Sequence, residues 1–279
     1  MALAVCVCVC VCARAQVWNG SECSGTPSPA HTTSLPKQYI MAMHPHGPFP
    51  VSASIVMPQL ARFGEPLGDL FEPVRFAAAS AIFALPLVRD MYLWLGAIEA
   101  GRKTLLHALS KGHSLAILPG GEHEQLLVCP DGSPFEDVVP PVDGLFRLAL
   151  ETQTPIVPVF SFGERRSYES SSFGLSFRVG LVKKYRIGLP IAWGRHKWFP
   201  FVPNPVPITI VVGKPIPLQS LPSSGDLGAA VAELRSSYLS AVQELFEAHK
   251  GSCEVASRKT LRWVARAALE TAAGGTKHQ

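Results

Sequence analysis

The distribution of apolar residues along the chain predicts alternating strands and helices. Short apolar runs, which are typical of buried strands, cover residues 39–43, 115–118, 156–160, 185–193 and 208–212. Helical spacing of apolar residues predicts helices over 101–111 and 144–152, and a long helix that begins after Asp226, a residue suited to cap it. This alternation predicts an α/β fold with a mostly parallel sheet flanked by helices.

Two histidines follow the first of these predicted strands. His44 and His46 are separated by Pro45, which cannot lie inside a helix because its φ is fixed and it has no N–H to donate. In an extended segment, residues two apart lie on the same side, so we expect both imidazoles to be presented together. Gly47 leaves room for a ligand beside the backbone. Imidazole is well suited to accept a proton near neutral pH, although a single histidine in a turn is more often structural.

A second polar motif follows the strand predicted over 115–118. Its sequence, at 119–124, is Pro-Gly-Gly-Glu-His-Glu. Ligands of open α/β sheets bind beyond the carboxyl ends of the strands, so neighbouring parallel strands would bring this motif to the histidines. A carboxylate bonded to one imidazole nitrogen fixes the tautomer and stabilises the charged ring. We therefore predict that His46 is the general base, that Glu124 orients it, and that His44 either assists or packs structurally.

The same motifs allow further roles. Backbone N–H groups around Gly120 and Gly121 are candidates to stabilise an oxyanion. A metal hydrolase that uses His44, His46 and His123 as ligands is an alternative from another class of enzyme. We predict no metal site, because the sequence holds no paired cysteine or histidine ligands at the usual spacing.

Four blocks of the sequence resemble the type-2 diacylglycerol acyltransferase family, which includes monoacylglycerol acyltransferases and wax synthases. Residues 44–47 are similar to its HPHG signature, and 119–124 to its glycine-glycine-x-x-glutamate segment. Residues 157–164 are similar to its VPxYSFGE block, and 207–216 to its PITxVVGxPI block. The blocks occur in the family's order, and they predict an acyltransferase domain over residues 39–250.

The resemblance implies a membrane-associated fold like that of the glycerolipid acyltransferases. It also implies transfer of a fatty acyl group from acyl-CoA, as co-substrate and without a cofactor, to the hydroxyl of an acylglycerol at the endoplasmic-reticulum membrane or the lipid-droplet surface. Diacylglycerol, giving triacylglycerol, is the leading acceptor. The alternatives are a monoacylglycerol or wax-alcohol acyltransferase and an inactive lipid-binding relative. Arg147 retains the second of two family cations, whereas Val142 replaces the first. The substrate-binding candidates are Gly47, Gly120, Gly121, Arg147 and Glu164.

Composition favours a lipid-related enzyme over a nucleic-acid-binding protein. The chain is 47% hydrophobic and only 16% charged, with a mean hydropathy of +0.21. Its net charge of +4 weakly favours an anionic membrane surface or the phosphates of CoA as partners. We find no basic stripe with interleaved aromatic residues, which binding of single-stranded nucleic acid requires. A length of 279 residues is enough for one large domain.

The amino-terminal segment, residues 1–38, has the character of low-complexity sequence. Residues 5–12 read Val-Cys four times. We expect this segment to be incomplete or incorrectly assigned, because the family carries a hydrophobic hairpin ahead of the HPHG signature. No apolar run reaches the ~18–20 residues that a membrane-spanning helix needs.

The carboxyl-terminal segment has a regular pattern of basic residues. Arg258, Arg262 and Arg266 recur at every fourth position. This spacing predicts a basic tail helix over residues 251–279, which lies either on a bilayer surface or in solvent.

Overall fold

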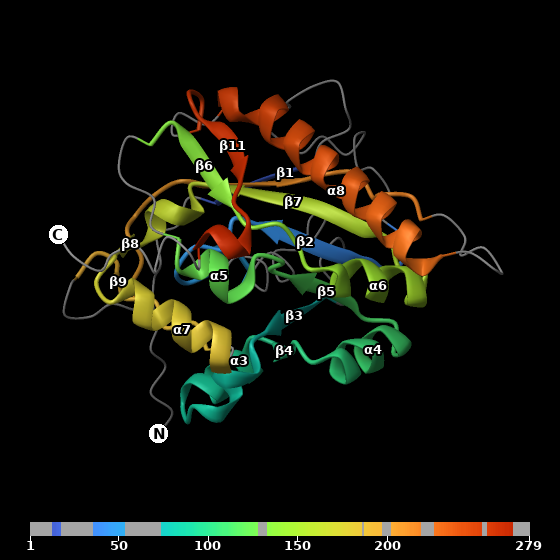
Figure 1. The fold of residues 1–279 in the computed structure, drawn as a ribbon, viewed down its shortest axis with the longest axis horizontal. Helices are drawn as coiled ribbons and strands as arrows, with labels where there is room; N and C mark the ends of the chain where they lie inside the picture. The colour runs from blue at the N-terminus through green and yellow to red at the C-terminus, as the bar shows by residue number, and fades with distance from the viewer. Residues whose placement is uncertain are drawn as a thin grey trace.

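The predicted α/β architecture is confirmed by the structure, a computed structural model in which helices flank a central sheet (Figure 1). Within the described part, no helix is both long enough and apolar enough to cross a membrane. The structure describes residues 13–17, 36–53, 74–127, 133–185, 187–196, 202–218, 226–252 and 256–269.

The central sheet has seven strands in the described part of the chain, in the order β1-β10-β7-β2-β5-β3-β4. The five strands from β7 to β4 are parallel, whereas β10 is antiparallel to β7 and β1 is parallel to β10. Two small sheets pair β11 with β6 and β8 with β9. The strands are β1 (Ala13–Val17), β2 (Ile40–His44), β3 (Val74–Ala78), β4 (Ile98–Glu99), β5 (Ser114–Ile117), β6 (Phe135–Val138), β7 (Ile156–Phe162), β8 (Glu169–Ser170), β9 (Ala192–Trp193), β10 (Ile208–Val212) and β11 (Thr260–Trp263).

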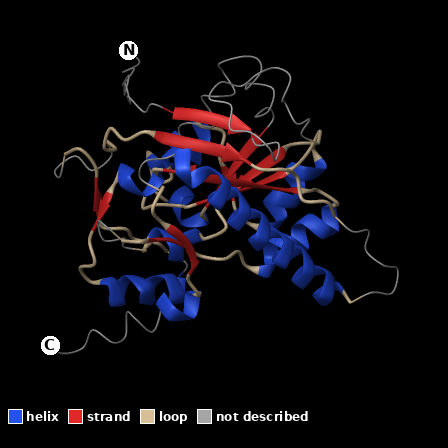
Figure 2. Ribbon diagram, turned by 90° about the horizontal axis from the view of Figure 1, so that it is seen from above, coloured by secondary structure: helices blue, strands red, loops and turns tan. Residues whose placement is uncertain are grey.

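Helices cover the sheet along its length, as the view from above shows (Figure 2). The α-helices are α3 (Val88–Trp94), α4 (Arg102–Ser110), α5 (Gly121–Gln125), α6 (Asp143–Thr152), α7 (Leu175–Tyr185) and α8 (Leu227–His249). Short 3-10 helices are η3 (Ser80–Ala84), η4 (Glu164–Ser167) and η5 (Lys250–Ser252).

Alternate residues of the strands enter two separate apolar clusters, because successive side chains of a strand point to opposite faces. Ile40 of β2 packs in a cluster with Phe146 of α6 and Tyr238 of α8. Met41, the next residue, packs in a second cluster with Tyr92 of α3. The sheet is therefore buried on both faces, which explains why its strands read as continuous apolar runs.

Most of the predicted elements are confirmed. β2, β5, β7 and β10 occupy the predicted apolar runs, and α4 and α6 occupy the predicted amphipathic segments. α8 begins after Asp226, whose side chain accepts a hydrogen bond of 2.7 Å from the N–H of Gly228. This is the capping interaction that the sequence predicts.

The prediction of a strand over residues 185–193 is wrong. α7 extends to Tyr185, and only Ala192–Trp193 pairs as a strand. Pro190 has no N–H for a ladder, and a Cβ on Gly188 would lie 2.2 Å from Oε1 of Gln125 in α5. The apolar segment therefore packs against α5 as an irregular connection.

The tail helix predicted for the carboxyl-terminal segment is wrong over residues 260–263, which form β11 and pair in parallel with β6. The side chain of Arg262 donates two hydrogen bonds, of 2.6 and 2.8 Å, to the carboxylate of Asp137 on β6. Arg266 donates to the carbonyl of Pro119 at 2.9 Å. The spacing of these arginines therefore reflects separate polar contacts rather than one face of a helix.

The low-complexity segment is only partly described. Residues 13–17 form β1 and pair with β10, so this stretch of the segment belongs to the sheet. The Val-Cys repeat at 5–12 lies outside the described residues.

Candidate active site

The parallel pairing of β2 with β5 brings His44 and Glu124 together. His44 is the last residue of β2, and Glu124 lies in α5, directly after β5. Nδ1 of His44 lies 3.3 Å from Oε2 of Glu124, and neither side chain has exposed surface. Because an ionised carboxylate only accepts hydrogen bonds, this contact assigns the proton of the neutral ring to Nδ1 and leaves the lone pair on Nε2. Nε2 is buried and has no hydrogen-bond partner among the described residues.

The glycine turn that precedes α5 determines the position of Glu124. A Cβ on Gly120 would lie 1.4 Å from Oε2 of Glu124 and 2.5 Å from its Cβ. Gly121 has a φ of +56°, in the left-handed region that glycine adopts without strain. The carboxylate can therefore fold back onto residue 120 only because that residue has no side chain.

The N–H of Gly121 is not available for the oxyanion role that the sequence suggests. It donates a hydrogen bond of 3.1 Å to the carbonyl of Leu118, which closes the turn. Of the two glycines, only Gly120 therefore remains a candidate to donate its N–H to an oxyanion.

His46 contacts Glu124 through its backbone rather than its ring. Its N–H donates to Oε1 of Glu124 at 3.2 Å, whereas Nδ1 of its ring donates to the carbonyl of Gly47 at 2.7 Å. The carboxylate-imidazole bond expected for His46 is thus made by His44. The physical reason is that β2 ends at His44, so the side-chain alternation of a strand does not extend to residue 46. Burial lowers the pKa of His46, against the opposing effects of Gly47 and Glu124, so its ring is neutral near pH 7.

Arg165 is a site residue that sequence reasoning missed. Its Nη2 lies 3.8 Å from Oε1 of Glu124, and its Nε lies 3.4 Å from Glu136. Burial alone would raise the pKa of Glu124, but His44, with Arg165 and His46, brings the pKa below its ordinary value. Its position in the chain could have indicated this role, because Arg165 follows β7, and Phe160 of β7 is in register with His44.

Two aromatic side chains enclose the His44 ring. The Trp263 ring meets it edge-on with centroids 5.5 Å apart, and the Tyr238 ring lies at 6.1 Å. Tyr238 belongs to the larger apolar cluster of the core, and Trp263 packs against that cluster. Because these rings exclude water, the electrostatic interaction between His44 and Glu124 is stronger than it would be in solvent.

Glu164 lies beneath the loop that follows the histidines. It is 1% exposed, and its carboxylate accepts hydrogen bonds of 3.2 and 3.3 Å from the N–H of Ser52. Gly47, with a φ of +65°, packs over it, since a Cβ there would lie 3.5 Å from Cγ of Glu164. Both residues support the backbone around His46, and their contact with a substrate stays a prediction.

Replacement of Glu164 by glutamine is expected to change the pH dependence of stability. Burial raises the pKa of Glu164 to about 7, so the folded protein holds a proton that the unfolded chain releases above pH 4.5. The contribution of Glu164 to the free energy of unfolding therefore falls by roughly 3 kcal/mol as pH rises from 4.5 to 7. The free energy of unfolding, measured by urea denaturation, should decline less in Glu164→Gln than in the wild type over this window. Parallel pH profiles of the two proteins would contradict the prediction.

Arg147 lies apart from these buried groups. It is exposed on α6, and it makes no ion pair with any residue that the structure describes. The predicted role of Arg147 in binding an anionic substrate stays a prediction.

The three histidines of the metal-hydrolase alternative do not form a ligand set. Across the described ranges, no three His, Cys, Asp or Glu side chains lie close enough together to hold a metal ion.

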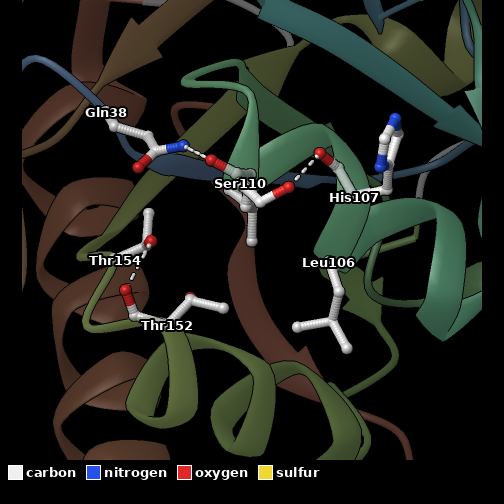
Figure 3. A pocket seen from close by; sticks show the side chains of 7 residues that line it. Gln38, Leu106, His107, Ser110, Thr152 and Thr154 are labelled. Atoms are coloured by element: carbon white, nitrogen blue, oxygen red, sulfur yellow. Dashed lines mark hydrogen bonds between the residues drawn. The ribbon is translucent and has the colours of Figure 1, made fainter.

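A hollow of about 500 Å³ lies at the opposite end of the strands (Figure 3). Gln38, which lines it, is six residues before His44, or roughly 20 Å along an extended chain. The polar groups of the hollow bond to nearby backbone: Nε2 of Gln38 donates to the carbonyl of Leu109 at 2.6 Å, and the hydroxyl of Ser110 donates to His107 at 2.8 Å. The hollow therefore takes no part in the chemistry at His44.

Comparisons with known proteins identify relatives over most of the chain. The family model described as diacylglycerol acyltransferase matches residues 30–263. Diacylglycerol O-acyltransferase 2-like protein 6 of Mus musculus is 30% identical over 79% of this chain and 68% of its own length. For 2-acylglycerol O-acyltransferase 3 of Homo sapiens, the identity is 30% over 84% of this chain and 71% of that protein. For diacylglycerol O-acyltransferase 2A of Umbelopsis ramanniana, it is 29% over 77% and 62%.

One solved structure is also similar. The crystal structure of the 1-acyl-sn-glycerophosphate acyltransferase PlsC from Thermotoga maritima has a TM-score of 0.40 and 15% sequence identity. The match covers 81% of this chain and 70% of that chain.

Proposed function

This chain belongs to the diacylglycerol acyltransferase family, and we propose that it transfers a fatty acyl group from acyl-CoA to the free hydroxyl of diacylglycerol, giving triacylglycerol. The observation that carries the proposal is the buried pair of His44 and Glu124 at the carboxyl edge of the sheet. The family is one of acyltransferases, and a carboxylate-oriented imidazole is the group that such a reaction needs to activate an alcohol. We place the reaction at the endoplasmic-reticulum membrane, in keeping with the family resemblance.

His44 acts as the general base in this proposal. Its Nε2 takes the proton of the acceptor hydroxyl, whose oxygen forms a bond with the thioester carbon of acyl-CoA. The C–S bond then breaks, and the CoA thiolate recovers the proton from Nε2. Glu124 holds the proton on Nδ1 and stabilises the imidazolium that forms between these two steps.

His46 and Gly120 complete the proposed catalytic group. The Nε2 lone pair of His46 is oriented by the bond from Nδ1 to Gly47, so this ring is suited to accept a hydrogen bond from the acceptor hydroxyl. The backbone N–H of Gly120 is proposed to stabilise the oxyanion on the thioester carbonyl.

Arg147 is the proposed contact for an anionic group of acyl-CoA. Arg266 donates to the carbonyls of both Pro119 and Pro140, so the segment before α6 lies beside the end of β5. We therefore propose that the exposed guanidinium of Arg147, in the second turn of α6, meets a phosphate of acyl-CoA as it approaches this edge.

Monoacylglycerol is a second candidate acceptor. The relative named 2-acylglycerol O-acyltransferase 3 is as similar to this chain, at 30% identity, as the relative named for diacylglycerol. The two proposals differ only in the number of acyl chains on the acceptor alcohol.

The proposed function is tested by expressing the full chain in a yeast that lacks its own neutral-lipid acyltransferases. Membranes are supplied with labelled acyl-CoA and with diacylglycerol, monoacylglycerol or a fatty alcohol in separate reactions. Labelled triacylglycerol, formed fastest from diacylglycerol, is the expected result. A preference for another acceptor would overturn the choice of diacylglycerol. The absence of acyl transfer from a folded chain would favour an inactive lipid-binding protein.

A further inference from the structure

Large exposed apolar side chains gather in two segments of the described chain. Five lie between residues 85 and 94, and six lie between residues 173 and 191, whereas Val142 is the one other such side chain in the described part. Trp94 is 82% exposed and Phe173 is 80% exposed. We call these eleven side chains the apolar patch. Exposed apolar side chains that gather in two segments, rather than being scattered singly, mark a site of interaction.

α3 presents its apolar residues away from the protein core. Tyr92 packs inward against Phe76, with ring centroids 6.2 Å apart. Met91 and Trp94 are three residues apart, so they are neighbours on the helix surface, and both are exposed. Leu87, directly before the helix, is 81% exposed.

α7 has apolar residues on both of its faces. Val179 and Val182 face inward and form a buried cluster with Leu126. Phe173, just before the helix, and Phe177, in its first turn, are both exposed. Since the inward face of α7 is already buried, the exposed Phe177 adds apolar surface that the described chain leaves uncovered.

The connection after α7 extends the same surface. Ile187, Leu189 and Ile191 are exposed, and they alternate with Gly188, which packs against Gln125. The side chain of the buried Arg178 donates to the carbonyl of Leu189 at 3.5 Å, which ties this connection to α7. Figure 1 shows α3 and α7 at the same lower end of the molecule.

We propose that the apolar patch inserts into the surface of a lipid bilayer that contains anionic lipids. The sequence from 173 to 191 has four basic residues and no Asp or Glu, and Lys183 and Lys184 are exposed at the end of α7. Aromatic and aliphatic side chains flanked by lysines are typical of helices that lie in the membrane interface. An anionic lipid surface attracts such cations.

The charge of α7 also favours a bilayer, rather than a second copy of this chain, as the partner that covers the apolar patch. A two-fold dimer through this surface would place the basic residues of both α7 helices in one interface. Repulsion between them would weaken that contact, whereas the negative potential of a bilayer strengthens the proposed one.

The patch lies one helix away from the catalytic pair. α7 packs on α5, which carries Glu124, and Gln125 of α5 donates a hydrogen bond of 2.7 Å to the carbonyl of Pro48 in the histidine loop. Insertion would therefore bring the reaction edge close to lipid acceptors in the membrane. This consequence rests on the proposed function, whereas the insertion itself does not.

Vesicle sedimentation tests the insertion without any substrate. The full chain is mixed with phosphatidylcholine vesicles that either contain or lack phosphatidylserine. We expect the wild type to sediment with the anionic vesicles, and the double variant Phe173→Glu/Phe177→Glu to bind them at least about tenfold more weakly. Val142→Glu, which adds a charge at an exposed apolar residue outside the patch, is the matched control and should bind as the wild type does.

Further measurements separate the possible failures. His44→Asn should bind vesicles as the wild type does, because binding requires no catalysis. Brominated lipids should quench tryptophan fluorescence, and Trp94→Phe should lose a large part of this quenching. Unchanged binding by a folded Phe173→Glu/Phe177→Glu variant would overturn the proposal. The proposal would also be overturned if the wild type formed a dimer without vesicles and the Phe173→Glu/Phe177→Glu variant did not, because a second copy of the chain would then cover the patch.

Discussion

Replacement of His44 by alanine is expected to lower the rate of acyl transfer about 10²–10⁴-fold, the usual cost of losing a general base. The side chain has no exposed surface, and its Nδ1 is bound to Glu124 at 3.3 Å, so Nε2 is the proton acceptor that the carboxylate orients. The measurement is the initial rate of labelled triacylglycerol formation at saturating acyl-CoA. The decrease should appear in kcat rather than in KM, because the base acts in the transition state.

Two companion variants make this prediction decisive. His44→Asn keeps an N–H that can reach Glu124 but has no basic nitrogen, so it should be as inactive as alanine while leaving a smaller cavity beside Trp263. Circular dichroism and a thermal melt confirm that each variant is folded. His46→Ala should retain more activity than His44→Ala. The reverse order would restore His46 to the role of base that the sequence suggests.

The position of the site could be predicted from the sequence, but which of the two histidines bonds to Glu124 could not. The end of β2 and the turn after β5 follow from apolar runs and from Gly and Pro, which are strong local signals. The choice between two imidazoles depends on where the strand stops, to within one residue. Element boundaries are set by tertiary packing and are the least certain part of a sequence-based prediction.

The neighbours of the pair were harder to predict because they come from distant parts of the chain. Arg165 belongs to the connection after β7, and Trp263 belongs to a strand whose partner, β6, is more than 100 residues earlier. A short strand such as β11 exists only through this distant pairing, so local periodicity in 260–263 carries little information about it. The long helix α8 is the opposite case, since its spacing and its cap at Asp226 are local features.

Replacement of Glu124 by glutamine is expected to lower kcat by a similar factor, about 10²–10⁴. In the wild type, Glu124 accepts from the His44 ring and from the backbone N–H of His46, and it lies 3.8 Å from Arg165. An amide has only one oxygen, so its NH₂ group would face one of these donors. The His44 ring can avoid this clash by moving its proton from Nδ1 to Nε2, and it then no longer accepts a proton from the substrate.

Glu122→Gln provides the matched control, because it makes the same chemical change on the same helix at a side chain whose charge acts on the pKa of His46 but that has no contact with His44 among the described interactions. Its kcat should stay near that of the wild type. Glu124→Asp retains the charge on a shorter side chain, so it should keep more activity than Glu124→Gln. The decisive comparison is between His44→Asn and Glu124→Gln, each checked for folding by a thermal melt. If the first is inactive and the second keeps most of its kcat, Glu124 does not orient the base, and its burial beside Gly120 and Arg165 serves only to hold the loop in place.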